Sequence, residues 1–271
     1  MPHRNRGQTL ARIGTIIALV LLVAALSLPL WSGVLARFLP RSIEVSIGDS
    51  LVQSLDQQSF CRGDEGLAAL DEVVAALARA ANTNEEFQVY VVDADVLNAF
   101  AAPGGRIVLF RAIIEKSDDP GEVAGVLAHE MAHVIERHPS KAIVQALGYG
   151  IFGLLNPGAD TVGSDAAQAV MTNHYSRNDE LDADRVGVEM LNEAGYDSRG
   201  LLTFFARLDA EGAKIPGALE FLSTHPTGER RAAALEKLVR EGEPVMDAEA
   251  WAALRAVCKD KGSPRATSDA R

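Results

Sequence analysis

Cysteine is scarce in this sequence, which contains Cys61 and Cys258 among 271 residues and no others. No Cys–His grouping is present, so the pattern does not suggest a metal site built on thiolates. Two states of the pair stay open. An oxidising compartment would allow the two residues to pair and tie both ends of the intervening region together, and otherwise they would be unpaired buried thiols.

Basic residues are outnumbered by acidic ones. The chain has 26 Lys and Arg against 37 Asp and Glu, which gives a net charge of -11 at pH 7. Four of the arginines and none of the acids lie in the first 40 residues, so the remainder has 22 basic and 37 acidic residues and a net charge of -15. Such a domain is not expected to bind nucleic acid through bulk charge, and anionic lipid should not attract it strongly.

Internal repeats are missing as well, since no tetratricopeptide period or other repeat is evident. With 48% hydrophobic residues, the chain can hold one substantial domain with little left over for a second. Hydrophobic periodicity predicts a mostly helical α+β fold with one small sheet, in which 105–111 is a strand and 87–92 its expected partner. The predicted helices are 64–82, 120–138, 140–155, 178–195, 199–211, 228–241 and 247–258.

The N-terminus contains one long uncharged run. Three arginines precede an apolar stretch over residues 13–36, which is long enough to cross a bilayer. Positive charge before the run predicts a cytoplasmic N-terminus over residues 1–12 and a folded domain on the far side of the membrane. A cleaved signal peptide is the competing interpretation, favoured by Pro29, but the apolar run is longer than a usual signal core and therefore favours an uncleaved anchor.

The rest of the chain divides by composition. Residues 37–60 are predicted to be a linker, residues 61–258 the folded domain, and residues 259–271, which are polar with Gly, Ser and Pro, a disordered tail. A second apolar stretch, 143–155, is too short to span a membrane. It predicts a core helix or a membrane-facing flap.

The most informative segment is His-Glu-Met-Ala-His at residues 129–133. Residues four apart on an α-helix lie on the same face, so His129 and His133 can converge on one metal ion while Glu130 stands beside it. This is the spacing of zinc peptidases. The competing interpretation is that both are core histidines of a buried helix.

Start and stop signals place this motif inside a helix. Residues 119–122, Asp-Pro-Gly-Glu, form a capping box with proline at the first helical position, and Pro139 is predicted to stop the helix. A later helix is predicted to open with Ser176 or Asn178 as its cap. The motif therefore lies mid-helix, as metal binding from one face requires.

A catalytic metal site needs a third protein ligand, and Glu180 is the best candidate. Asp184 lies one turn further on the same helix face, where it could receive the free N–H of a ligating histidine and fix its tautomer. For Asp179 and Asp182, acidic residues that complement the helix dipole are the preferred interpretation.

His138 could in principle extend the motif to a third histidine. It comes one residue early for that pattern, and Glu136 stands where a turn-forming glycine would be needed. We therefore expect His138 to pack structurally or to act as a cation at a helix C-terminus.

Several segments taken together resemble the M48 family of metallopeptidases over roughly residues 65 to 240. The matching residues are Leu97–Ala101 with Pro103–Gly105, His129–His133 with Arg137 and His138, Ser176 and Arg177 with Glu180, Ala183 and Asp184, and Thr224–Pro226 with Arg231. The resemblance implies a zincin-like metallopeptidase domain without a tetratricopeptide repeat module.

The resemblance also implies roles for individual residues. One Zn²⁺ ion would be bound by His129, His133 and Glu180, and Glu130 would be the general base that activates a bound water. Asp184 would support a ligating histidine from outside the metal's own ligands. Peptide bonds would then be hydrolysed without a covalent intermediate.

Three further residues receive roles from the resemblance. Asn98 and Arg231 would help to hold substrate, and His225 would lie near the metal as a transition-state donor or a displaceable fourth ligand. For His225 a structural His-Pro turn is the alternative. If the sheet has an open edge beside the metal, substrate could add to it as an extended strand, whereas a small hairpin would only brace the helix.

The function expected from the resemblance is a membrane-anchored zinc endopeptidase of envelope quality control, acting on misfolded or unassembled polypeptides. It would sit in the bacterial inner membrane with the domain in the periplasm, or be released there after signal cleavage. The alternative is a zinc-binding assembly factor or holdase with little proteolytic activity. Glu130 argues against that alternative, because a pure binding protein needs no general base.

Overall fold

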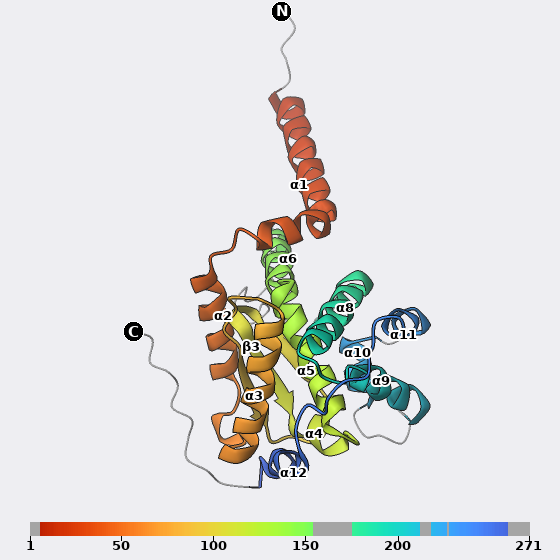
Figure 1. Ribbon diagram of the computed structural model, residues 1–271. Coiled ribbons are helices and arrows are strands. Elements are labelled where there is room, and N and C mark those ends of the chain that lie inside the picture. Colours follow the sequence, from red (N-terminus) through yellow and green to blue (C-terminus); the bar gives the residue numbers. More distant parts are fainter. Residues whose placement is uncertain (1–5, 154–174, 212–217, 227, 260–271) are drawn as a thin grey trace, which may run out of the picture.

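The computed structural model describes residues 6–153, 175–211, 218–226 and 228–259. Helices dominate, and three short strands, β1 (Gln88–Val92), β2 (Ala99–Ala102) and β3 (Arg106–Phe110), form one small mixed sheet (Figure 1). The α-helices described are α1 (Arg6–Ala36), α2 (Arg41–Ser54), α3 (Asp64–Ala80), α4 (Arg111–Lys116), α5 (Pro120–Ile135), α6 (His138–Gly153), α8 (Arg177–Glu193), α9 (Gly200–Glu211), α10 (Ala218–Thr224), α11 (Glu229–Leu235) and α12 (Ala248–Ala256). The predicted α+β, mostly helical class is confirmed.

The N-terminal helix α1 projects away from the rest of the molecule (Figure 1). Its segment Leu10–Ala36 is long and apolar enough to cross a membrane. Large apolar side chains along it, such as Leu19 and Leu26, are exposed instead of packed into a core. Water is a poor environment for so much contiguous apolar surface, so the helix fits the predicted membrane anchor.

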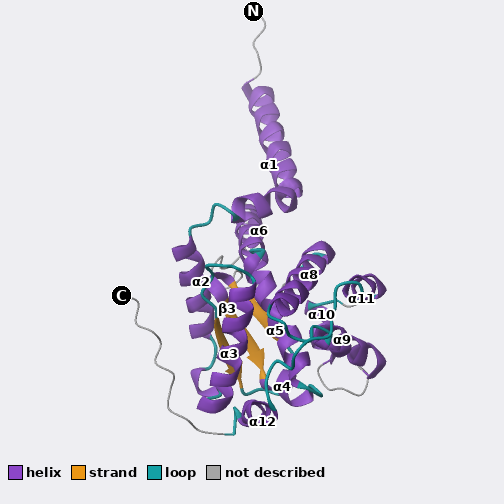
Figure 2. Ribbon diagram, viewed as in Figure 1, coloured by secondary structure: helices purple, strands orange, loops and turns teal. Residues whose placement is uncertain are grey.

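The sheet has the order β1–β3–β2, with β3 in the centre. β1 pairs with β3 in parallel, and β2 pairs with β3 in the antiparallel sense, with Ala101 opposite Ile107. In Figure 2 the strands lie inside a shell of helices. The sheet is therefore a buried support for the helices on its two faces.

Alternation along β3 divides the interior into two cores. Ile107 and Leu109 point into the larger core with residues of α3, α5 and α8, whereas Val108 points into a smaller one with Leu51 of α2 and Ile143 of α6. Successive side chains of a strand point to opposite faces, so one strand contributes to both cores. The larger core holds α5 against the sheet.

Helix α5 starts where the sequence predicts. The Asp119 side chain accepts hydrogen bonds from the backbone N–H groups of Gly121 and Glu122, and Pro120 occupies the first turn. In the predicted capping box the Glu122 carboxylate would accept from the backbone N–H of Asp119. In the structure it accepts from the backbone N–H of Asp118 instead. These contacts satisfy N–H groups that have no partner within the helix.

The two cysteines form a disulfide between Cys61, just before α3, and Cys258, just after α12, 197 residues apart in the sequence. Beside it, the backbone N–H of Gly63 donates to the carbonyl of Val257. The bond joins the two ends of the folded domain, and of the two states left open by the sequence the structure has the paired one.

We expect loss of this disulfide to lower the free energy of unfolding by about 2–5 kcal/mol, because the unfolded chain regains the freedom of a very long loop. Urea denaturation of the full chain in detergent should show the difference between the wild type and the Cys61→Ser/Cys258→Ser variant. A reductant should destabilise the wild type and leave the double variant unchanged. Equal stability of the two proteins would contradict the prediction.

Several predicted boundaries differ from the structure. The helix expected over 120–138 ends at Ile135, and α6 starts at His138, so Pro139 lies in the first turn of α6 instead of stopping α5. Arg137 has a φ of 59° at this bend, and the left-handed residue breaks the helix. Proline is tolerated in a first turn because its missing N–H would have no partner there.

Other differences concern segments with weak local signals. The predicted linker 37–60 contains α2, which packs on the smaller core, and the helix predicted over 228–241 is confined to α11. The strands at 88–92 and 106–110 pair as predicted, but in parallel, so the hairpin alternative is wrong. Residues 154–155 and 260–271, part of a predicted helix and nearly all of the predicted tail, lie outside the described residues.

Candidate metal centre

Helix α5 brings both motif histidines to one place. His129 and His133 are buried, and their Nε2 atoms lie 3.0 Å apart. Both rings project from one face because the residues are one turn apart. The interpretation of two independent core histidines does not fit this convergence, because two ring nitrogens directed at each other need a proton or a cation between them.

Helix α8 supplies the carboxylate expected from the sequence. Ser176 caps the helix by accepting from the backbone N–H of Asp179, and the Asp179 side chain completes the capping box. Glu180 follows in the first turn, with its Oε2 3.5 Å from His129 Nε2 and its Oε1 3.5 Å from His133 Nε2. The close packing of α8 on α5 needs Gly187, whose added Cβ would lie 3.1 Å from the backbone of Ala128.

His225 joins the same cluster from the segment that follows α10. Its Nδ1 lies 3.3 Å from His129 Nε2 and 3.4 Å from Glu180 Oε1, while its Nε2 lies 3.3 Å from Glu130 Oε1. Phe221 packs against the ring, with centroids 5.0 Å apart. The structure thus brings four potential ligands, His129, His133, Glu180 and His225, within 4.8 Å of one another.

The spacing of these atoms fits a tetrahedral metal ion. Atoms bound at about 2.0–2.2 Å on neighbouring corners of a tetrahedron lie about 3.3–3.5 Å apart. Among His129, His133 and Glu180 the separations run from 3.0 Å between the two histidine nitrogens to 3.5 Å between those nitrogens and the Glu180 oxygens, and with His225 all four potential ligand atoms lie within 4.8 Å of one another. A nitrogen and oxygen donor set of this kind suits zinc.

Buried carboxylate oxygens without aligned hydrogen-bond donors in the described part of the chain also indicate a site for a cation. Both Oε atoms of Glu180 and both of Glu130 are buried and accept no aligned hydrogen bond from the described residues, although Arg231 Nη1 lies 2.7 Å from Glu180 Oε2. Buried carboxylates without aligned donors are costly unless a cation or water completes them. The residues present therefore fit a bound metal ion.

The pKa values of the two buried glutamates are shifted in opposite directions. Burial raises the pKa of Glu130, even though His225, His129 and the backbone N–H of Ala101 oppose the shift. For Glu180 burial acts in the same direction, but the neighbouring His225, His129 and His133 outweigh it and hold the pKa well below its ordinary value. Glu180 is therefore anionic, as a metal ligand must be, whereas Glu130 accepts protons more readily.

The two histidines of the motif also differ. Burial would lower the pKa of His129, but Asp184 and Glu180 outweigh that effect and raise the pKa to about 9. Burial lowers the pKa of His133 well below its ordinary value, despite Glu180. A bound metal would take the place of the proton that His129 otherwise holds.

Asp184 supports His129 from outside the cluster. Its Oδ1 lies 3.1 Å from His129 Nδ1, and its two oxygens accept hydrogen bonds of 2.7 Å each from the Nε and Nη2 of Arg231. The third contact of the same guanidinium is a hydrogen bond from Nη1 to the carbonyl of Pro226, next to His225. Arg231 is buried and packs over Phe205, whereas the neighbouring Arg230 is exposed.

His133 has a different set of neighbours. The Nδ1 of His138 lies 2.8 Å from His133 Nδ1, and the other ring nitrogen of His138 lies 3.5 Å from Asp179, which Lys141 also contacts. Tyr175 stacks on the His133 ring at a centroid distance of 4.1 Å. These contacts fix the orientation of His133 and show that His138 packs structurally; it starts α6 and is not a cation at a helix C-terminus.

The structure adds residues that the sequence did not indicate. Asp179 of α8, expected only to complement the helix dipole, also contacts His138 and Lys141 and so links α8 to α6. Nothing in the sequence around Tyr175 or Phe221 marks them as neighbours of the cluster, because aromatic stacking depends on the packing of distant segments.

Asn98 lies directly before β2 and is not among the four clustered residues. Its Oδ1 accepts from the backbone N–H of Ala99 and lies 3.3 Å from the hydroxyl of Thr224, the residue before His225. β2 pairs with β3 on one side, and among the described residues no strand pairs with its other side. All four of its residues are buried, so this edge is not open to solvent in the structure.

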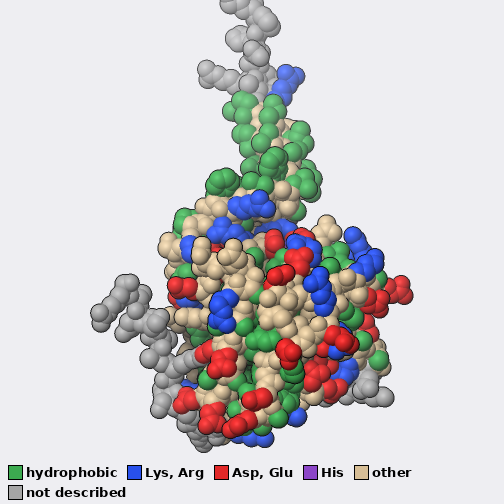
Figure 3. Space-filling view, in the orientation of Figure 1, with side chains coloured by type: hydrophobic (Ala, Val, Ile, Leu, Met, Phe, Trp, Pro, Cys, Tyr) green, Lys and Arg blue, Asp and Glu red, His purple; other side chains and the backbone are tan. Residues whose placement is uncertain are grey.

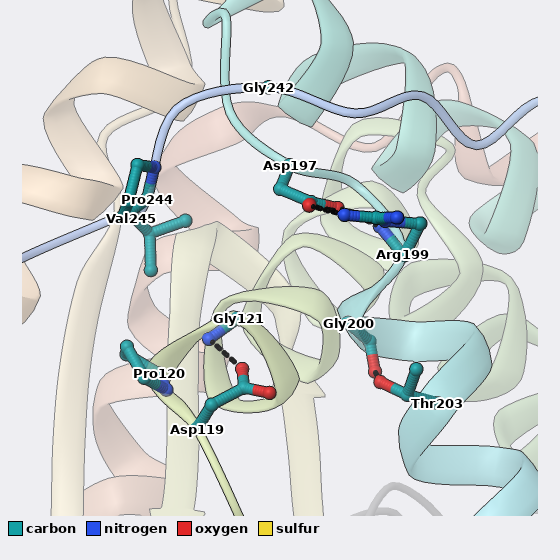
Figure 4. Close-up of a pocket in the computed structure, with 10 residues that line it drawn as sticks. All are labelled: Asp119, Pro120, Gly121, Asp197, Arg199, Gly200, Thr203, Gly242, Pro244 and Val245. Carbon is teal, nitrogen blue, oxygen red and sulfur yellow. Dashed lines mark hydrogen bonds and ion pairs between the residues drawn. The ribbon is translucent and has the colours of Figure 1, made fainter.

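A separate pocket of about 410 Å³ lies at the N-terminal end of α5 (Figure 4). Its charged side chains are already paired, since Asp119 caps α5 and Arg199 contacts Asp197 and Glu241. The residues that line it include none of the four clustered potential ligands. The metal cluster is therefore the better candidate for a functional site.

Comparison with known proteins bears on this cluster directly. The family model described as peptidase family M48 matches residues 67–239, a span that includes all four clustered residues. This chain belongs to the M48 family. As an M48 peptidase it has the His-Glu-x-x-His helix and the later glutamate in the order expected from the resemblance.

Individual relatives of this M48 chain are moderately similar. It is 30% identical to the beta-barrel assembly-enhancing protease of Yersinia pestis over 57% of the chain and 35% of that protein. The Escherichia coli K12 protein of the same name is 28% identical over 75% of the chain and 45% of its own length. The mitochondrial metalloendopeptidase OMA1 of Arabidopsis thaliana is 34% identical over 58% of the chain and 33% of its length. The chain thus spans less than half the length of these curated relatives.

Proposed function

We propose that this chain is a zinc-dependent endopeptidase that hydrolyses peptide bonds by means of an activated water molecule. The observation that carries the proposal is the convergence of His129, His133 and Glu180 around one point, with the unsatisfied carboxylate of Glu130 beside it. Three protein ligands of this kind leave a position for water or substrate. When bound there, zinc would polarise the scissile carbonyl and lower the pKa of the water.

The chain's own residues would then move the protons. Glu130, whose pKa is raised by burial, would accept a proton from the attacking water and pass it to the leaving amine. His225 lies 3.3 Å from Glu130 and is close enough to stabilise the oxygen that becomes negative during attack. Its Nδ1 lies 3.3 Å from His129 Nε2 and 3.4 Å from Glu180 Oε1, so it would act as a fourth ligand at rest and move aside for substrate.

Arg231 would act by positioning the ligands. Its guanidinium is already engaged by Asp184 and by the carbonyl of Pro226, and it lies 2.7 Å from Glu180. These contacts favour a role in holding Glu180 and Asp184 over direct contact with substrate. Asn98, beside the β2 edge, would contribute to substrate binding if that edge opens for an extended chain.

The relatives' names suggest the biological setting. One name refers to a protease that enhances the assembly of beta-barrels and the other to a metalloendopeptidase of mitochondria. In line with the first name, misfolded or unassembled envelope polypeptides would be the substrates here. The apolar helix α1 supports a single-pass anchor, and the Cys61–Cys258 disulfide supports an oxidising compartment such as the periplasm. The intact mass of the purified protein would distinguish an uncleaved anchor in the bacterial inner membrane from a cleaved signal peptide.

The metal assignment predicts that Glu180→Ala weakens zinc binding by more than about 100-fold, because even neighbours of metal ligands typically contribute 10- to 100-fold. The full chain in detergent should hold one zinc ion and digest unfolded casein, and the variant should lose both properties. Zinc content after gel filtration and a competition titration with a chelator measure the change. Asp182→Ala is the matched control, since Asp182 is an exposed acid on the same helix. A wild type without zinc would overturn the proposal.

A further inference from the structure

Helix α6 packs along the membrane-spanning helix in an antiparallel register. Starting from the bend, Arg137 contacts the carbonyls of Ala36 and Arg37 at the end of α1. Further along α6, Gln145 donates a 2.8 Å hydrogen bond to the hydroxyl of Ser32, which is fully buried. α6 therefore runs back along α1 from the body toward the apolar part of the anchor (Figure 1).

Small residues allow the two helices to lie close together. A Cβ added at Gly148 of α6 would lie 2.3 Å from a terminal carbon of Leu28 in α1, and one at Gly33 would lie 4.0 Å from Lys141. Small residues at close helix contacts and a single interhelical hydrogen bond between polar side chains are typical of helix pairs inside membranes. The contacts with Leu28 show that the pairing extends eight residues into the apolar segment.

The depth of this contact follows from helix geometry. The 27 residues of Leu10–Ala36 rise about 40 Å, whereas the hydrocarbon core of a bilayer is about 30 Å thick. Leu28 lies about 12 Å along the axis from Ala36 by the same rise per residue. Because Pro29 lies inside α1 and a proline in a helix interior bends the helix, this axial length is an upper limit; with the bilayer centred on the apolar segment, Gly148 lies at most about 7 Å below the hydrocarbon surface.

The charged residues of α6 lie only at its start, before the part that would enter the bilayer. Its two basic residues, His138 and Lys141, lie in its first turn, and Lys141 is paired with Asp179 of the body. From Ala142 to Gly153 the helix has no charged residue, and Leu147, on the face not covered by α1, is 42% exposed. An exposed leucine next to a paired glutamine is unfavourable in water but suits acyl chains.

Polar and aromatic residues mark the level at which the membrane would end. Basic side chains gather where the apolar helix meets the body (Figure 3), and Arg37, Arg41 and Arg137 belong to this junction. Trp31 and Phe38 are exposed there, at 61% and 79%. Aromatic and basic residues of this kind are enriched at the headgroup layer.

From these contacts we infer that α6 enters the bilayer beside α1 as a short re-entrant helix, with the exposed Leu147 and the partly exposed Val144 against the acyl chains. This inference rests on the proposal that α1 is a membrane anchor. The occupant of the exposed α6 face is lipid, because that face continues the lipid-covered surface of α1. Since α5 ends at Ile135, two residues before Arg137, the metal cluster is held next to the membrane surface.

Lipid-quenching fluorescence of the full chain in vesicles tests the inference. A maleimide-linked environment-sensitive dye is attached to Leu147→Cys, with Val144→Cys as a second position; the native cysteines are paired and do not react. Val20→Cys in α1 is the buried-in-lipid reference, and Glu249→Cys, exposed on α12, is the water reference. The vesicles contain phosphatidylcholine brominated in the middle of its acyl chains, mixed with phosphatidylglycerol.

We expect the dyes on α6 to be quenched about half as strongly as the dye at Val20, because they lie nearer the membrane surface, whereas Val20 lies near the middle of the apolar segment. Quenching no greater than at Glu249 in both α6 positions would overturn the inference, and so would a blue-shifted but unquenched signal, which indicates a protein partner. An unquenched dye at Val20 would overturn both the anchor and the re-entrant helix. None of these readouts depends on proteolysis, so loss of the proposed activity would be distinguishable.

Discussion

Replacing Glu130 by glutamine is expected to leave one zinc ion per chain in place and to slow peptide cleavage by about 10²- to 10⁴-fold. Glutamine has the same shape but cannot accept a proton from water. Glu130 is not among the four clustered ligands, so the metal should not depend on it. Zinc analysis of the full chain, together with the rate of casein cleavage or self-cleavage, measures both quantities in one preparation.

The matched control is Glu136→Gln, which makes the same change of charge at the end of the same helix, where the carboxylate is partly exposed. We expect this variant to bind zinc and cleave like the wild type. If Glu130→Gln leaves the biological function intact, the alternative of a zinc-binding assembly factor or holdase gains support. If it loses zinc, Glu130 is itself a ligand and the assignment of Glu180 must be revised.

Arg231→Ala is expected to lower the free energy of unfolding of the metal-free protein by about 3–5 kcal/mol, because it leaves a buried carboxylate without its partner. Asp184 loses two hydrogen bonds, and Glu180 loses a cation 2.7 Å away. Since Asp184 also contacts His129, zinc affinity should fall about 10- to 100-fold. Denaturation in a chelator and a competition titration measure the two effects.

Arg230→Ala provides the comparison, because Arg230 is exposed, and an exposed substitution of this kind is expected to change stability by less than about 0.5 kcal/mol. Arg231→Lys keeps the charge but not the bidentate hydrogen bonding to Asp184, so we expect an intermediate loss of stability and of zinc affinity. A stable Arg231→Ala variant with normal zinc affinity and a raised KM would contradict the positioning role. That result would favour the substrate-holding role implied by the family resemblance.

The effect of Arg231→Ala should also depend on pH. Burial would raise the pKa of Asp184, but Arg231 and His129 outweigh it and lower the pKa below its ordinary value. A carboxyl with a depressed pKa stabilises the fold above the pKa of the unfolded chain, about 4, and loses that contribution as the pH falls through its folded-state pKa. The difference between wild type and variant should therefore shrink in acid.

Local signals were enough to predict much of the site. The caps at Asp119 and Ser176 depend on a few consecutive residues, and the convergence of His129 and His133 depends on the pitch of a single helix. The segment 37–60 was different, because α2 has no strong pattern of its own and its position depends on packing against the sheet. β2 is short and alanine-rich, so its pairing with β3 likewise had little local signal.

By itself the sequence determined the apolar helix, the helix of the His-Glu-x-x-His motif and Glu180 as the candidate for a third ligand, since each follows from a local pattern of residues. Only the tertiary structure decided that His225, 96 residues after His129, lies within 3.3 Å of it. The tertiary structure also decided that the two cysteines are paired, that Arg231 and not Arg230 contacts Asp184, and that α6 packs against α1. Contacts between distant segments depend on how whole elements pack, and a local pattern contains no information about that packing.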